Sequence, residues 1–375
     1  MNHRDINKPE LTIILPCLNE EKAIGFCLDE IKKVIDKNNI AAEILVVDNG
    51  STDRSCHIVQ TMAKQLPKLK LIHESQPGYG NACRRGLTEA KGNYIYLSDA
   101  DGSYNFSDIP LFLEKLRKGT DLIVGNRFQG GIENGSMPWH HRYVGNPVLS
   151  AFVKIFFKVK IGDIHCGARA ISHSALTKLQ LHADGMEFAS EMIMKSARQG
   201  LSMVEIPIHY QPRIGDSKLR SVRDGWRHLR FILLYSPLYL FFIPGATLFI
   251  IGTIVLSTLY LTSPTVFGVQ LFVHPMFLAS AMIILGYELV FFAFFAKIYA
   301  MTHLGEANYF VERLFKIITI EKAGFLGLFL CFVGIAIYSV IAANWIHSGF
   351  GSLDQFKNSI VALTLFIIGA QTFFS

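Results

Sequence analysis

Two carboxylates one residue apart, Asp99 and Asp101, come directly after an apolar, β-type run over residues 94–98. Carboxylate oxygens are the ligands that Mg²⁺ and Mn²⁺ prefer, and α/β sheets bind ligands at the carboxyl ends of their strands. The pair could therefore hold a divalent metal that bridges a diphosphate. Taken alone, the same residues also fit an ordinary turn after a strand.

The first third of the chain alternates apolar strands with helix-length segments. Such alternation predicts an α/β domain with a doubly wound, mainly parallel sheet, which would bring the strand ends to one edge. The expected strands are residues 11–16, 42–48, 69–73, 94–99 and 121–126, and the expected helices are residues 20–36, 53–65, 80–90 and 107–117.

Polar residues follow several of these strands. After the second strand comes Asp48, whose carboxylate could accept hydrogen bonds from a base or a ribose. After the third strand, the glycines at 78 and 80 resemble part of a dinucleotide-binding fingerprint. That motif belongs after the first strand and needs a third glycine, so a dinucleotide cofactor is disfavoured.

Charge divides the chain into two unlike parts. The 375 residues include 36 Lys and Arg and 30 Asp and Glu, which gives a formal net charge of +6. After Ser236 there are five basic and five acidic residues, so the excess positive charge belongs to the first part. A basic region joined to a neutral, apolar one indicates a membrane surface or anionic substrates. Nucleic acid is disfavoured, because zinc-ligand spacing and basic runs interleaved with aromatic residues are both absent.

Four long apolar stretches follow, three of them close to the ~20 residues that a helix needs to cross a bilayer. The loop between the second and third is basic, so the positive-inside rule predicts that this loop and the N-terminal domain both lie in the cytoplasm. In mid-span, Glu288 is expected to hydrogen-bond between helices rather than to contact substrate. The expected spans are residues 238–261, 276–296, 323–343 and 360–374.

The expected organisation is a cytoplasmic domain over residues 1–217, an interfacial amphipathic region over 218–237 and a multi-pass membrane region over 238–375. In the middle region, apolar residues recur near helical spacing among basic ones, which is typical of a helix in the headgroup layer. The six cysteines are scattered singly, as in a reduced cytosolic protein. We therefore expect a protein of the cell inner (cytoplasmic) membrane.

Five sequence blocks, in order and at the expected spacing, resemble glycosyltransferase family 2, which has the GT-A nucleotide-diphospho-sugar transferase fold. More closely, the chain is similar to polyprenyl-phosphate glycosyltransferases of the dolichyl-phosphate mannose and glucose synthase type. The resemblance covers residues 11 to about 240, and the four-span tail is similar to that of multi-span members. The blocks are residues 16–21, 46–53, 78–82, 98–102 and 125–127.

The resemblance implies a donor site and a metal site. Asp99 and Asp101 would position Mg²⁺ or Mn²⁺ with the sugar diphosphate. Ser103 stands where many members carry a glutamine of the metal shell, and it could act through its hydroxyl or a water. The expected nucleotide-sugar-binding residues are Pro16, Asn19, Glu20, Asp48 and Asp99.

On the acceptor side, a lipid phosphate needs cations near the membrane surface, and several basic residues lie in the half of the domain nearer the spans. For any one of them, a surface salt bridge is the alternative. The resemblance places Arg127 and Arg169 against the phosphate, as catalytic residues together with Asp99 and Asp101. The expected acceptor-phosphate residues are Arg127, Arg169, Arg213, Ser217 and Lys218.

The expected reaction is inverting transfer of a hexose from a UDP- or GDP-sugar to undecaprenyl or dolichyl phosphate. A phosphate oxygen is already anionic at pH 7, so a strong general base is not required. Glu187 and Glu191, one helical turn apart, are the base candidates, with a purely structural pair as the alternative. A processive polysaccharide synthase is the rival enzyme, although its Gln-x-x-Arg-Trp motif is missing. A non-catalytic membrane subunit that binds nucleotide sugars is the other alternative function. Assembly as a homo-oligomer is also compatible with the sequence.

Overall fold

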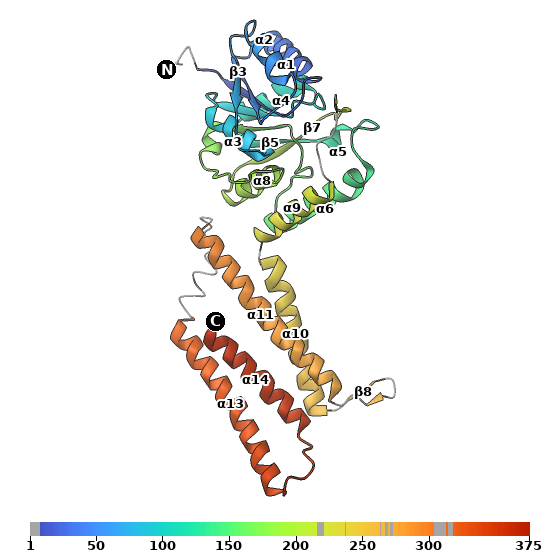
Figure 1. Ribbon diagram of the computed structural model, residues 1–375, viewed down its shortest axis with the longest axis vertical. Coiled ribbons are helices and arrows are strands. Elements are labelled where there is room, and N and C mark those ends of the chain that lie inside the picture. The colour runs from blue at the N-terminus through green and yellow to red at the C-terminus, as the bar shows by residue number, and fades with distance from the viewer. Residues whose placement is uncertain are drawn as a thin grey trace. The chain divides into compact units, whose positions relative to one another are not determined.

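The computed structural model describes residues 8–215, 221–236, 238–262, 264–266, 269–270, 273–303, 313 and 318–375. The chain divides into two compact units, Met1–Ile232 and Leu233–Ser375 (Figure 1). The first is built on a sheet and the second is built from long helices.

Within the described part of the first unit, seven strands form one mixed sheet in the order β3-β2-β1-β4-β6-β5-β7. All neighbouring strands are parallel except at β6, which runs antiparallel to both β4 and β5. The five expected strands are confirmed to within two residues, and the strands β6 and β7 were not predicted from the sequence. The strands are β1 Leu11–Cys17, β2 Ala42–Asp48, β3 Leu69–His73, β4 Tyr94–Leu97, β5 Leu122–Asn126, β6 Arg169–Ser172 and β7 Met203–Pro207.

Helices cover this sheet. α3 packs against β1 and β2, α4 packs against β4, β5 and β6, and α1 packs against α2. The strands under these helices are almost continuously buried, as expected for a sheet that is covered on both faces. The helices are α1 Ile24–Asn38, α2 Ser55–Ala63, α3 Tyr79–Glu89, η1 Phe106–Asp108, α4 Ile109–Arg117, α5 Arg127–Gly130, η2 His141–Gly145, α6 Asn146–Phe157, α7 His173–Leu176, α8 Phe188–Arg198 and α9 Ser221–Leu234.

Strand order creates a switch point at the centre of the sheet. From β1 the chain builds outward through β2 and β3, and it then returns to place β4 on the other side of β1. In α/β sheets, ligands bind in the crevice at the carboxyl ends of such neighbouring strands. The reversed strand β6 begins at the same edge, because Arg169 pairs with Leu97 of β4 and with Val124 of β5.

Among the described residues of the second unit, four helices are long and apolar enough to cross a membrane, by length and composition. Each of the four expected spans coincides with one of these helices, and the last helix contains 19 residues, close to the ~20 that a bilayer requires. The elements are η3 Leu238–Phe242, α10 Ile243–Thr262, α11 His274–His303, α13 Ile320–His347 and α14 Phe356–Phe374, with a short hairpin of β8 Thr265–Val266 and β9 Val269–Gln270.

The membrane helices pack as two hairpins, α10 with α11 and α13 with α14 (Figure 1). Hydroxyl pairs join α11 to α14: Ser280 Oγ lies 2.6 Å from Thr364 Oγ1, and the Tyr287 hydroxyl bonds to Thr372. Among the described residues the side chain of Glu288 is exposed on α11, so its expected interhelical hydrogen bond stays a prediction. The next residue along a helix turns by ~100°, so Tyr287 faces α14 and Glu288 does not.

Candidate active site

Asp99 and Asp101 lie at the switch point, just beyond β4. Tyr79 donates its hydroxyl to Asp99 Oδ1 at 2.9 Å. Asp101 is 6% exposed, and its Oδ1 accepts the backbone N–H and the hydroxyl of Ser103 at 3.0 and 2.5 Å. Ser103 therefore orients Asp101 in this conformation, and its expected place in a metal shell stays a prediction.

The backbone passes very close to Asp99 at Gly167. A Cβ atom there would lie 2.4 Å from Asp99 Oδ2, so only glycine fits without a shift. On the other side, Gly102 adopts a φ of +76°, a left-handed conformation that favours glycine. These two glycines let the chain turn tightly around the carboxylate pair.

The carboxylate pair fits a divalent cation. Burial and the charge of Asp101 raise the pKa of Asp99 to about 6, so a bound cation would stabilise the ionised pair. Arg213 supplies some positive charge: its Nη2 lies 3.5 Å from Asp101 Oδ2 and 3.2 Å from Glu20 Oε1. Hard oxygen ligands of this kind suit Mg²⁺ or Mn²⁺. Asp99 and Asp101 are the residues that would hold the ion.

Because a proton and a metal compete for Asp99, metal affinity should depend on pH. The carboxylate is ionised above its pKa of about 6 and protonated below it. Mn²⁺ affinity should thus be nearly constant above pH 7 and fall by up to ~10-fold per pH unit below pH 6. Calorimetric Mn²⁺ titrations of the purified protein at a series of pH values would measure this. In Asp99→Asn the Mn²⁺ affinity should be lower, and it should fall less steeply as the pH is lowered. An unchanged pH dependence in this variant would mean that the competing proton binds a group other than Asp99.

The loops after β1 and β2 are joined to each other. Asn19, in a left-handed conformation with φ of 52°, donates its backbone N–H to Ser51 Oγ at 2.9 Å and accepts the N–H of Thr52 at 2.7 Å. Glu20 receives a similar anchor, since its N–H bonds to Ser55 Oγ at 2.8 Å. Pro16 lies one residue before the end of β1. The expected donor residues of the first loop are therefore held beside the second loop.

Asp48 closes β2 and is buried. It accepts the N–H of Ser51 at 3.1 Å and lies 3.2 Å from Nδ1 of His73. Burial alone would raise the pKa of Asp48, but the hydrogen bonds from Ser51 outweigh it and the net shift is downward. Asp48 is therefore an anion at neutral pH, suited to accept an N–H or O–H group of a ligand.

Arg127 and Arg169 are buried and bound to protein atoms. Arg127 makes a two-pronged ion pair with Asp163, at 2.7 Å from Nε and 2.8 Å from Nη2. The guanidinium of Arg169 donates to the carbonyls of Cys166, Ala189 and Ile164. Their expected contact with an acceptor phosphate stays a prediction, and in this conformation their donors hold the 163–166 loop.

The buried pair yields a prediction about stability. Asp163→Ala would leave the Arg127 guanidinium buried without its counter-ion, which should lower the free energy of unfolding by about 3–5 kcal/mol. The exposed pair of Arg117 and Glu10 is a matched control with the same two-pronged geometry. Glu10→Ala should cost about 1 kcal/mol or less. Thermal unfolding of both variants would measure the difference, and equal losses would contradict the prediction.

The two base candidates have different surroundings. Both carboxylate oxygens of Glu191 are bound, to the N–H groups of His182 and Ala183 and to Lys195. Glu187 accepts from Arg227 at 3.0 Å, while its Oε2 is buried and has no hydrogen-bond partner among the described residues. Of the two, Glu187 alone keeps an oxygen available within the described part of the chain.

Some residues near the site were not expected from the sequence. Tyr79 reaches Asp99 from the start of α3. His165 is half-buried and lies in sequence between residues that bind Arg127 and Arg169. Both of its ring nitrogens are buried, and neither has a hydrogen-bond partner among the described residues. Its position in the sequence, a few residues before the expected acceptor residue Arg169, was the available signal. Ser217 and Lys218 lie outside the described residues.

The sheet with a carboxylate pair at its switch point lies in one chain with four helices that are long and apolar enough to cross a membrane. The pattern of glycosyl transferase family 2 matches residues 12–180, and that of the glycosyltransferase family 2 C-terminal transmembrane region matches residues 294–375. The chain belongs to glycosyltransferase family 2 and has the GT-A fold with a C-terminal membrane region.

Curated relatives support this assignment. The chain is 34% identical over 367 residues to the low-salt glycan biosynthesis hexosyltransferase Agl6 of Haloferax volcanii. This match covers 98% of this chain and 87% of the relative. It is 28% identical to a dolichyl-phosphate hexose transferase of the same organism, over 58% of this chain and 89% of the relative. It is also 28% identical to the dolichyl-phosphate beta-glucosyltransferase of Saccharomyces cerevisiae, over 64% and 77%.

Proposed function

We propose that the protein transfers a hexose from a UDP- or GDP-sugar to a polyprenyl phosphate, either dolichyl or undecaprenyl phosphate. The reaction would occur at the cytoplasmic face of the inner membrane and invert the anomeric centre. The similarity to dolichyl-phosphate hexosyltransferases supports the acceptor class. The observation that carries the proposal is the Asp99–Asp101 pair, which Arg213 meets from the segment expected to bind the acceptor.

On the donor side, Asp48 would accept a hydrogen bond from the base or ribose, with Pro16, Asn19 and Glu20 lining the same pocket. The joined loops after β1 and β2 support this assignment, because they hold these residues close together without a ligand. Asp99 and Asp101 would hold Mg²⁺ or Mn²⁺, with Ser103 fixing Asp101. When bound, the ion would neutralise charge on the departing diphosphate.

On the acceptor side, Arg213 is the arginine best placed to bind a phosphate. Its side chain is 25% exposed, whereas Arg127 and Arg169 are buried. Arg127 and Arg169 would contribute mainly through their fixed charge, which already opposes the upward pKa shift of Asp99. If Asp99 and Asp101 hold a metal, the guanidinium of Arg213 would be available to pair with the lipid phosphate.

The chemical step would need little proton transfer. An oxygen of the acceptor phosphate is anionic at neutral pH and would attack the anomeric carbon as the bond to the diphosphate breaks. The protein would position the two substrates and balance their charges. If the acceptor arrives protonated, Glu187 would be the base, because its Oε2 is the oxygen that remains available.

Radiolabel transfer tests the proposal. The purified full-length protein would be supplied with a panel of labelled UDP- and GDP-hexoses and a short-chain polyprenyl phosphate. The expected product is extractable into organic solvent and labile to mild acid. A polymer that elongates on one primer would instead indicate a processive synthase. Tight nucleotide binding without turnover across the panel would indicate a binding subunit.

A further inference from the structure

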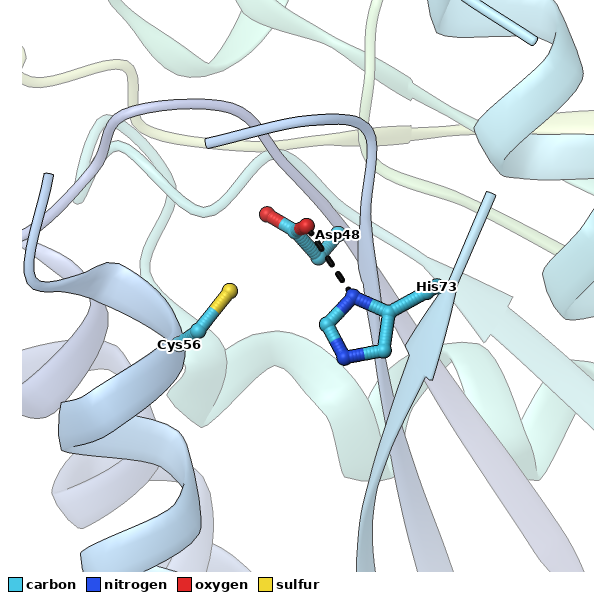
Figure 2. Close-up of side chains that lie close together, drawn as sticks. All are labelled: Asp48, Cys56 and His73. Atoms are coloured by element: carbon cyan, nitrogen blue, oxygen red, sulfur yellow. Dashed lines mark hydrogen bonds and ion pairs between the residues drawn. The ribbon is translucent and has the colours of Figure 1, made fainter. Parts of the chain in front are cut away.

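Asp48, Cys56 and His73 converge outside the carboxylate pair. Asp48 and His73 are the last residues of the neighbouring parallel strands β2 and β3 and pair directly in the sheet, and Cys56 lies in the first turn of α2. Figure 2 shows the three side chains pointing toward one another. One carboxylate oxygen, the thiol sulfur and a ring nitrogen all lie within 4.8 Å of one another.

This set of atoms matches a borderline transition metal. Zn²⁺ takes Cys, His and Asp ligands in tetrahedral geometry, with metal–nitrogen and metal–oxygen bonds of ~2.0 Å and metal–sulfur bonds of ~2.3 Å. Two ligand atoms at ~2.0 Å on a tetrahedron lie ~3.3 Å apart. His73 Nδ1 and Asp48 Oδ2 are 3.2 Å apart, so these two are already at the required separation. A hard ion such as Mg²⁺ prefers oxygen ligands and binds a thiol poorly.

Charge and access also fit. Asp48 is anionic, whereas burial and the nearby carboxylate of Asp48 raise the pKa of the Cys56 thiol to about 11. An incoming ion would form a bond to sulfur as the thiol proton leaves to solvent, giving two anionic ligands for a divalent ion. The His73 side chain is 64% exposed and Cys56 is partly exposed, so an ion can reach the site from solvent.

We propose that Asp48, Cys56 and His73 form a second metal site, selective for Zn²⁺-like ions, and that its occupation excludes the nucleotide. The exclusion of the nucleotide rests on the proposed function, in which Asp48 accepts a hydrogen bond from the base or ribose of the donor. An ion bound to one oxygen of Asp48 would occupy that oxygen and neutralise its charge, which would weaken the hydrogen bond that the carboxylate offers to the nucleotide. Free Zn²⁺ would then inhibit transfer by competing with the donor.

Co²⁺ titration of the full-length protein tests the site without any activity assay. A tetrahedral thiolate site should give a charge-transfer band in the near ultraviolet and release about one proton per ion. Cys56→Ser should lose the band, and His73→Gln should weaken binding by at least ~10-fold. Cys331→Ser is the matched control, because Cys331 is the other cysteine that is not buried, and it should leave the band unchanged. Absence of the band, or its persistence in Cys56→Ser, would overturn the site.

Competition tests the link to the donor. Saturating UDP or GDP should weaken Co²⁺ binding, and Zn²⁺ should raise the apparent KM for the nucleotide sugar in wild type but not in Cys56→Ser. If the band responds to Cys56→Ser but to neither nucleotide, the metal site stands and its overlap with the donor pocket is refuted. Failure of hexose transfer alone would leave the Co²⁺ result unaffected, so the two proposals fail separately.

Discussion

Asp101→Ala is expected to lower hexose transfer by ~10²–10³-fold or more, because the variant loses half of the carboxylate pair that would hold the metal on the leaving diphosphate. Asp101 is buried, and its Oδ1 accepts a hydrogen bond from the hydroxyl of Ser103, which fixes the carboxylate in place. The measurement is the initial rate of label transfer to a short-chain polyprenyl phosphate at several Mg²⁺ and Mn²⁺ concentrations. High metal should restore little activity.

Two further variants separate catalysis from folding. Asp101→Asn keeps the shape of the side chain and can still accept from Ser103, yet it loses the charge, so it should be nearly as inactive as the alanine variant. Asp29→Ala, at an exposed carboxylate on α1, should transfer at the wild-type rate. Undiminished transfer in Asp101→Asn would remove the metal role from this residue.

Arg213→Ala is expected to lower kcat/KM for the lipid acceptor by ~10–100-fold, since a hydrogen bond to a charged group contributes ~1.5–3 kcal/mol. Arg213 now pairs with Glu20 and Asp101. Its removal should therefore leave Mn²⁺ affinity unchanged or tighter, because a competing cation is gone. The kcat/KM for the acceptor should therefore fall while Mn²⁺ affinity does not fall, a combination that a general loss of structure would not produce.

Kinetics with varied acceptor and varied donor would measure the first effect, and Mn²⁺ titration would measure the second. Arg213→Lys keeps the charge but loses the planar fork, so it should recover part of the acceptor kcat/KM. Arg85→Ala, in an exposed pair with Glu89 on α3, is the matched control. A loss confined to donor KM would move Arg213 from the acceptor site to the nucleotide site.

Much of the fold could be predicted because each early element carries its own local signal. Apolar runs such as residues 42–48 alternate with amphipathic helices, and the four spans are longer than soluble helices require. β6 and β7 were missed because the regular alternation of strands and helices does not continue after β5. The direction of β6 is set by pairing with strands that lie far away in sequence, which no local pattern records.

The site was predictable in its carboxylates and not in its partners. Asp99 and Asp101 stand out through their spacing after a strand. The partner of Arg127 lies 36 residues away at Asp163, and a positive charge in a sequence does not reveal whether it is already paired. Likewise, nothing in the spacing of two glutamates one helical turn apart distinguishes the bound Glu191 from its neighbour.

The reversed strand β6 has an evolutionary consequence. The chain leaves β5 at Asn126 and re-enters the sheet at Arg169, so both ends of the intervening segment are fixed at one edge of the sheet. Residues 131–162 contribute no strand to the seven-stranded sheet. Changes in the length of the exposed parts of this excursion should therefore be tolerated better than changes within the strands.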